Sequence, residues 1–322
     1  MTAAAGGVAP GEVIGFVGLG NMGIPMARRL VAAGYQVRGF DTSAEAARNF
    51  AGIGSSDAGG GVTAVAELGA VGEGAAAVIL MLPDSDIVER VLLGRLASEP
   101  EPAQESPGGL LASLPAGATV IDMSSSDPTR TQALAPLLAA AGVTLLDAPV
   151  SGGVAGARAG ALAVMVGGPA AEFSRFKPML GAIGSRVVHA GDTGAGHAVK
   201  ALNNLMSAAT LLASSEALIA GRRFGLDPAV MLEIINGSSG RSASTENKWP
   251  NYVLTGKYDA GFALRLMIKD IRLALAIEHA TGVTATASEA VVAAWEAAGR
   301  DLPPDADHTA IARWVDEQAG GH

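Results

Sequence analysis

Short apolar runs rich in β-branched residues alternate with longer Ala- and Leu-rich stretches along the first half of the chain. Such runs are typical of strands buried on both faces, and the stretches between them follow the helical period. We expect strands at residues 13–17, 36–40, 77–82, 119–122, 144–147, 162–166 and 186–189. We expect helices at residues 22–33, 44–50, 87–96, 131–141 and 171–183. This order predicts an α/β fold with a doubly wound, parallel sheet.

The hydrophobic pattern changes after residue 196. Residues 198–220 contain no Gly or Pro and are apolar almost all round. They predict a helix of about 35 Å that is buried between domains or subunits. Asp227 and Pro228 form a helix-start signal, and residues 264–280 and 286–298 follow the helical period. The second half of the chain is therefore predicted to be all-α.

These patterns predict two domains. The α/β domain covers residues 12–193, and residues 194–322 contain the connecting helix and the all-α domain. Residues 97–109 are rich in Pro, Glu, Ser and Gly and lack apolar periodicity, so we expect a mobile, peripheral surface loop there.

Composition excludes several classes of protein. The 322 residues are 49% apolar and only 16% charged, which excludes a disordered chain. With a net charge of −9, the chain lacks the excess of basic residues that nucleic-acid binding requires. No nucleic-acid partner is therefore expected. The absence of Cys excludes disulfides and thiolate nucleophiles. The first 11 residues lack a secretory signal, and the apolar run at 75–83 is too short to span a membrane, so we expect a cytoplasmic protein.

A glycine-rich segment, GLGNMG, lies between the first predicted strand and helix. In this context the first glycine permits a tight turn, the second lets the backbone approach a pyrophosphate, and the third lets helix and sheet pack closely. The helix N-terminus supplies N–H groups and a positive dipole end for the anion. The candidate cofactor-binding residues are Gly18, Leu19, Gly20, Asn21, Met22 and Gly23.

An acidic residue follows the second predicted strand. Asp41 lies 41 − 23 = 18 residues beyond the last glycine of the motif, where a carboxylate accepts hydrogen bonds from an adenosine ribose. A 2′-phosphate would be repelled there, and Thr42 and Ser43 supply no guanidinium. The sequence therefore favours NAD and leaves NADP open. The alternative is that Asp41 only caps the turn.

Two further motifs carry groups suited to binding and catalysis. Ser151, Gly152 and Gly153 form a turn whose N–H groups and hydroxyl can converge on a carboxylate, although many such turns bind no ligand. Lys200 and Asn204 lie four residues apart on one face of the apolar helix. Desolvation lowers the pKa of a lysine toward values useful for proton transfer. The alternative for Lys200 is a purely structural ion pair or a side chain that extends to solvent.

These motifs occur in an order that resembles one family. The chain contains GFVGLGNMG, MLP, DMSSS, DAPVSGG, GAGHAVKALNN and RLMIKD between about residues 12 and 298. In this it is similar to the β-hydroxyacid dehydrogenases, and in particular to 3-hydroxyisobutyrate dehydrogenase. The resemblance implies a Rossmann-type domain, a long interdomain helix and a helical domain that builds a homodimer or homotetramer. It also implies an oxidoreductase that transfers a hydride between a nicotinamide cofactor and a short β-hydroxy acid or its semialdehyde.

The resemblance implies a role for each matching residue. Lys200 matches the catalytic general acid and base, and Asn204 the amide that helps to hold the substrate. The segment from Ser151 to Gly153 matches the loop that binds the substrate carboxylate. The positions matching further cofactor contacts are Leu82, Pro83, Ser125 and Lys269. For Lys269 the alternative is an ordinary ion pair with Asp270.

Other features of the sequence limit or leave open the interpretation. Arg241, Lys248 and Trp249 lie where family members vary around the substrate, although each is more typical of a surface position. The five histidines lack metal-ligand spacing, so no metal is expected. An imine reductase and a non-catalytic dinucleotide-binding protein remain alternatives. The sequence does not choose among 3-hydroxyisobutyrate, tartronate semialdehyde, 4-hydroxybutyrate and sulfonate analogues as substrate.

Overall fold

The computed structural model describes residues 7–99 and 109–320, and the chain divides into two compact units, Met1–Lys200 and Ala201–His322. Most of the loop expected at residues 97–109 lies outside the described residues, as does the start of the chain.

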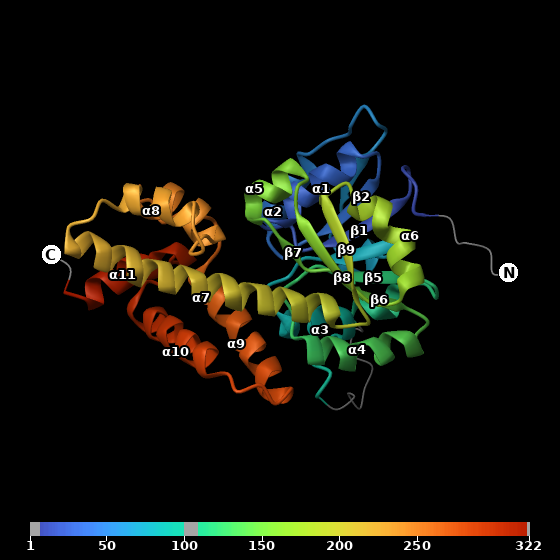
Figure 1. Ribbon diagram of the computed structural model, residues 1–322. Helices are drawn as coiled ribbons and strands as arrows, with labels where there is room; N and C mark the ends of the chain where they lie inside the picture. The colour runs from blue at the N-terminus through green and yellow to red at the C-terminus, as the bar shows by residue number, and fades with distance from the viewer. Residues whose placement is uncertain (1–6, 100–108, 321–322) are drawn as a thin grey trace. The chain divides into compact units, whose positions relative to one another are not determined.

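Unit 1 contains a nine-stranded sheet (Figure 1). The strands are β1 (Val13–Val17), β2 (Gln36–Phe40), β3 (Gly61–Ala64), β4 (Ala77–Leu80), β5 (Thr119–Asp122), β6 (Thr144–Asp147), β7 (Val150–Ser151), β8 (Ala163–Gly167) and β9 (Arg186–Gly191). Their order is β3-β2-β1-β4-β5-β6-β8-β7, with β9 beside β8. The strands from β3 to β6 are mutually parallel, which confirms the predicted Rossmann-type sheet.

The sheet departs from the predicted parallel arrangement at one end. Strand β8 pairs antiparallel with both β6 and β7. Strands β3 and β7 are missing from the prediction because β3 is a half-exposed edge strand and β7 has only two residues.

Helices cover both faces of the sheet. They are α1 (Gly23–Ala32), α2 (Ala44–Ala51), α3 (Ser85–Leu93), α4 (Pro128–Ala140), α5 (Gly153–Ala159) and α6 (Ala170–Leu180), with short turns η1 (Leu68–Val71) and η2 (Leu110–Ser113). Helices α3 and α4 begin earlier than predicted because Asp84 and Asp127 accept hydrogen bonds from the first-turn N–H groups.

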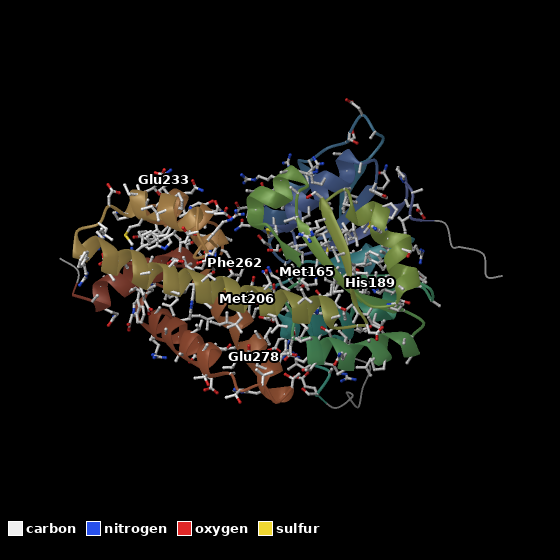
Figure 2. All side chains as sticks on the ribbon, in the orientation of Figure 1. Met165, His189, Met206, Glu233, Phe262 and Glu278 are labelled. Carbon is white, nitrogen blue, oxygen red and sulfur yellow. The ribbon has the colours of Figure 1, made fainter. Side chains whose placement is uncertain are left out.

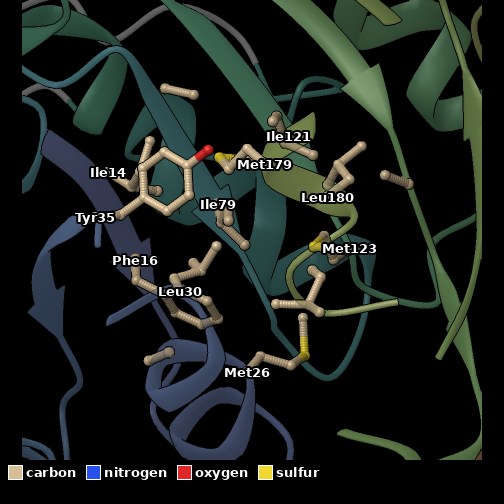
Figure 3. Packing of buried hydrophobic residues seen from close by; sticks show 14 of the residues in the cluster. Ile14, Phe16, Met26, Leu30, Tyr35, Ile79, Ile121, Met123, Met179 and Leu180 are labelled. Carbon is tan, nitrogen blue, oxygen red and sulfur yellow. The ribbon is translucent and has the colours of Figure 1, made fainter. Parts of the chain in front are cut away.

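Alternation along the strands places apolar side chains on both faces. Ile14, Phe16 and Ile79 belong to one core cluster, which also contains residues of α1 and α6 (Figure 3). Val78 and Leu80, the neighbours of Ile79 in β4, belong to a second cluster with residues of α3 and α4. The alternating direction of strand side chains therefore explains why the sheet is covered on both sides.

Helix α7 (Ala195–Phe224) has 30 residues and extends beyond the predicted helix at both ends. Its N-terminal end is capped by Asp147, which accepts the N–H groups of Gly194 and His197. Its C-terminal end is followed by Gly225, whose φ of +100° is a conformation that favours glycine.

Unit 2 is helical and has its own core. After α7 come α8 (Pro228–Asn236), the π-helix η3 (Ser244–Val253), α9 (Leu264–Ala280), α10 (Thr286–Asp301), η4 (His308–Ala310) and α11 (Ile311–Gln318). Trp295 is fully buried in this core, whereas Glu233 projects from α8 into solvent (Figure 2). Within the described residues, no helix is long and apolar enough to cross a membrane.

Candidate active site

The glycine-rich segment forms the loop between β1 and α1. Gly18 has a φ of +96°, which favours glycine, and its N–H donates to the Phe40 carbonyl at 3.0 Å. A Cβ atom on Gly23 would overlap the Gly18 carbonyl. The first and last glycines therefore allow the tight turn and the close approach of α1 that the motif predicts.

The end of α1 at this loop fits an anionic group. Within the described chain, no side chain caps this helix end, and its first turn contains no acidic residue. Helix N-termini carry N–H groups without intrahelical partners and a partial positive charge. Gly20 and Asn21 are exposed and border a cavity of about 690 Å³. The loop therefore has the donors and the space that a dinucleotide phosphate requires.

Asp41 joins the loop to the end of β2. Its Oδ2 accepts the Leu19 N–H at 2.7 Å and its Oδ1 accepts the Ser43 N–H at 2.7 Å. The side chain is half-buried. Asp41 thus holds the loop in shape, and each carboxylate oxygen has a second lone pair for a ribose hydroxyl.

Leu82, Pro83 and Ser125 lie at the same edge of the sheet as this loop, because β1, β4 and β5 are adjacent and parallel. Ser124 Oγ accepts the Leu82 N–H at 3.0 Å. The buried Asp122 accepts the Ser124 N–H at 3.0 Å. A part-buried hydrogen bond therefore joins the segments after β4 and β5, and a buried one fixes Ser124 within the second segment.

The Ser-Gly-Gly turn lies between β7 and α5. Gly152 and Gly153 have φ values of +131° and +60°, and both are exposed. Ser151 is half-buried. Strand β7 is at the end of the sheet away from β1, but Val154 on α5 lines the same cavity as Gly20.

A buried polar network fixes the start of α7. Asp147, fully buried at the end of β6, accepts the N–H of Gly194 at 2.7 Å and that of His197 at 2.9 Å. Gly196 is required here because a Cβ would overlap the Met165 carbonyl and approach Asp147 Oδ2 to 2.9 Å.

The imidazole of His197 is part of this network. The Thr131 hydroxyl donates to the Asp127 carbonyl at 3.0 Å, so His197 Nδ1 is the donor in its 2.9 Å bond to Thr131. Nε2 lies 3.7 Å from Asp122 Oδ2 and has no hydrogen-bond partner among the described residues.

Lys200 and Asn204 follow on the same helix, and both are buried, with 8% and 5% of their surface exposed. Asn204 Nδ2 donates to Asp270 Oδ2 at 2.6 Å. Lys269 Nζ lies 3.3 Å from Asp270 Oδ1, so the ion pair considered for Lys269 is present. Asp270 therefore joins the predicted residues Asn204 and Lys269.

Of Arg241, Lys248 and Trp249, all of which were expected at the surface, only Arg241 is exposed. Trp249 is only 4% exposed and packs in the core of unit 2, because η3 turns this side of the segment inward. Arg241 is exposed and pairs with Glu246 at 2.8 Å. Lys248 is half-buried, and its Nζ donates to Ser207 Oγ at 2.7 Å.

Sequence reasoning missed the residues that hold these groups in place. Asp122, Asp147 and His197 occur in the motifs without an assigned role, and Asp270 occurs there only as the alternative partner of Lys269. An unusual density of polar residues at strand ends was the available signal. No group of three or more acidic or histidine side chains suitable for a metal ion occurs in the described part of the chain.

Family comparisons cover nearly the whole chain. Residues 13–191 match the family described as the NAD binding domain of 6-phosphogluconate dehydrogenase. Residues 194–315 match the family described as NAD-binding of NADP-dependent 3-hydroxyisobutyrate dehydrogenase.

Individual relatives have similar lengths. The chain is 41% identical to a 2-(hydroxymethyl)glutarate dehydrogenase of Eubacterium barkeri over 262 residues, which is 81% of either chain. It is 41% identical to a 3-hydroxyisobutyrate dehydrogenase of Pseudomonas aeruginosa over 269 residues, 82% of this chain and 84% of the relative. The solved structure of Mycobacterium tuberculosis 3-hydroxyisobutyrate dehydrogenase with L-serine has a TM-score of 0.83 and 31% identity, and the match covers 95% of this chain and 99% of that one.

Proposed function

Because this chain belongs to the β-hydroxyacid dehydrogenase family and is an NAD(P)-dependent dehydrogenase acting on CH–OH groups, we propose that Lys200 is its catalytic general acid and base. The substrate is a short β-hydroxy acid, which is interconverted with its semialdehyde. The observation that carries the proposal is the burial of an ammonium on α7 one helical turn from a buried amide, Asn204, in a chain of this family.

The cofactor supplies the redox chemistry, since its nicotinamide ring accepts or donates the hydride when it is bound. The chain supplies binding and orientation. The N–H groups of the Gly18–Gly23 segment would hold the phosphates, and Asp41 would accept hydrogen bonds from the adenosine ribose. Leu82, Pro83 and Ser125 would contact the nicotinamide half. Lys269, whose Nζ lies 3.3 Å from Asp270 Oδ1, would contribute a cation toward the cofactor.

Lys200 moves a proton at the substrate hydroxyl. It takes the hydroxyl proton during oxidation and returns it during reduction, a role that typically changes rates by about 10²- to 10⁴-fold. Asn204 orients the same hydroxyl. One of the two N–H groups of its amide donates to Asp270 at 2.6 Å, which limits the orientation of the side-chain amide.

The substrate carboxylate binds the Ser151–Gly153 turn. Both glycines have positive φ, are exposed and directly follow Ser151, and successive N–H groups in such a turn can bind an anion. The relatives named above act on 3-hydroxyisobutyrate and 2-(hydroxymethyl)glutarate, and both compounds carry a primary alcohol β to a carboxylate. We propose this shared unit as the group that the chain oxidises.

Two further proposals complete the function. NAD is the preferred cofactor, because a 2′-phosphate beside the Asp41 carboxylate would be repelled. The chain assembles with copies of itself, as a dimer or tetramer. Phe224 and Ile234, at the end of α7 and on α8, are 85% and 63% exposed, and burial of such side chains favours association.

The proposal is tested by the absorbance at 340 nm with NAD or NADP and a panel of short β-hydroxy acids at alkaline pH. We expect Lys200→Ala to lower kcat by about 10²-fold or more while the Kd for NAD stays unchanged. Lys257→Ala is the matched control, because Lys257 is exposed. Wild-type turnover in the Lys200→Ala variant would remove Lys200 from the mechanism.

A further inference from the structure

Helix η3 runs along α7 in the opposite direction. Ser244 Oγ lies 3.2 Å from Thr210 Oγ1, and Lys248 Nζ lies 2.7 Å from Ser207 Oγ. A step of four residues forward along η3 thus corresponds to a step of three residues back along α7. Along α7, the Lys248 contact is therefore closer to Asn204 than the Ser244 contact is.

Ser207 lies on the same face of α7 as the two proposed active-site residues. Lys200, Asn204 and Ser207 are spaced by four and three residues, which places them in one row along a helix. At 1.5 Å per residue, Ser207 is about 4.5 Å beyond Asn204 and about 10 Å beyond Lys200 along the helix axis. The Lys248 ammonium is thus held roughly one helical turn from the amide that orients the substrate.

The surroundings of Lys248 fix its position. The next residue, Trp249, is buried in the core of unit 2, which anchors the backbone at this point. The Lys248 side chain is half-buried, and its Nζ donates to Ser207 Oγ. By contrast, Arg241 in the same segment is exposed and pairs with Glu246, so it serves as a surface residue.

Together, the two side chains can bind an anion. Because Lys248 donates to Ser207 Oγ, the hydroxyl hydrogen of Ser207 points elsewhere and can donate to a second group. An ammonium and a hydroxyl side by side suit a carboxylate, and hydrogen bonds between charged groups are among the stronger ones. The site is one turn from Asn204, so the anion belongs to the far end of a substrate whose hydroxyl faces Lys200.

We propose that Lys248 and Ser207 bind a second carboxylate of the substrate, and that the preferred substrates are β-hydroxy dicarboxylic acids. This inference rests on the proposed function and refines it by naming the substrate class. A monocarboxylic β-hydroxy acid uses the same catalytic groups but leaves Lys248 without a substrate contact.

Kinetics with two substrates test the proposal. Wild type, Lys248→Met, Lys248→Arg and the control Arg241→Met are assayed with NAD and either 2-(hydroxymethyl)glutarate or 3-hydroxyisobutyrate. We expect Lys248→Met to lower kcat/KM for the dicarboxylate by about 10- to 100-fold, mainly through KM, and to change the monocarboxylate value by less than about threefold. Lys248→Arg retains a cation and should therefore keep most of the preference for the dicarboxylate that Lys248→Met loses. Arg241→Met should match wild type.

Binding of unreactive analogues gives a readout that does not depend on turnover. Calorimetric titration with glutarate and with isobutyrate, each in the presence of NAD, should show tighter binding of glutarate to wild type by about tenfold or more. That difference should disappear in Lys248→Met.

Several outcomes would overturn the inference. Equal losses of kcat/KM for both substrates would mean that Lys248 only supports the fold through Ser207. Equal affinity of wild type for glutarate and isobutyrate would exclude a second anion site. If wild type oxidises only the monocarboxylate, the proposed function stands and this inference fails. If wild type oxidises neither compound, the proposed function fails, and the glutarate titration alone decides whether Lys248 binds a carboxylate.

Discussion

Removal of the Asp147 carboxylate should loosen the start of α7. Asp147 accepts two backbone N–H groups, from Gly194 and His197, and its side chain is fully buried. The Asp147→Ala variant leaves both donors buried without these acceptors. Hydrogen bonds to charged groups contribute about 1.5 to 3 kcal/mol each, so we expect a loss of about 3 to 6 kcal/mol from the free energy of unfolding. For a unit of this size, that corresponds to a fall in melting temperature of about 6 to 24 °C.

Hydrogen exchange measures this effect locally. In wild type, amides of Gly194 and His197 should exchange slowly, and in Asp147→Ala the peptide containing them should exchange at least about 100-fold faster. Asp147→Asn keeps the shape of the side chain but only one acceptor oxygen. Its exchange rate and melting temperature should therefore lie between those of wild type and Asp147→Ala. Asp192→Ala is the matched control, since this exposed side chain is in the same turn and its loss should change stability by about 0.5 kcal/mol or less. Unchanged exchange and melting temperature in Asp147→Ala would refute the assigned role of the carboxylate.

Three other predictions concern the cofactor, pH and assembly. Asp41→Asn combined with Thr42→Arg should raise the ratio of kcat/KM for NADP to that for NAD by about tenfold or more. The reason is that the repelling carboxylate is replaced and a guanidinium is added. A wild type that already prefers NADPH would contradict this interpretation of Asp41. Burial raises the pKa of Asp307, but hydrogen bonds from His308 and Thr309 outweigh it and hold that pKa below the ordinary value of 3.8. Since the folded-state pKa is the lower one, Asp307 stabilises the fold above about pH 4 and this contribution is lost as the pH falls further. Asp307→Ala should therefore cost about 2 kcal/mol at pH 6, and urea denaturation at pH 6 and pH 3 should show the difference from wild type shrinking on acidification. Phe224→Ser with Ile234→Ser should shift the mass measured by light scattering from an oligomer toward a monomer, whereas a monomeric wild type would contradict the predicted assembly.

The strands and most helices were predictable because their signal is local. The apolar runs of β1 and β4, and the glycine-rich turn before α1, each lie within a few residues. Other features depend on distant partners. The direction of β8 relative to β6 is set by pairing between Asp147 and Gly167, and no pattern within either strand encodes it. The burial of Trp249 likewise depends on a π-helix in a polar segment that has no clear hydrophobic period.

The residues of the candidate site also divide into those that local sequence predicts and those that depend on distant partners. Residues that were expected to touch a ligand occur in motifs with recognisable spacing, such as Gly18 to Gly23. Residues that hold those groups in place are joined across long stretches of sequence. Asp147 reaches His197 over 50 residues, Asp270 reaches Asn204 over 66, and Lys248 reaches Ser207 over 41. Helix α7 receives all three contacts within 11 residues, because it carries His197, Asn204 and Ser207.

Because these contacts all lie on α7, they limit how far its neighbouring turns can move. A helix of 30 residues is stiff along its backbone, so contacts at one turn limit the movement of the next. Asp147 fixes the turn before Lys200, and Asp270 fixes the side chain of the residue one turn after it. Lys200 therefore lies between two buried carboxylate contacts whose lengths are 2.9 Å and 2.6 Å. If Lys200 transfers the proton as proposed, loss of either carboxylate should lower kcat even where cofactor binding is retained, because a proton transfer requires a donor and acceptor held within hydrogen-bond reach.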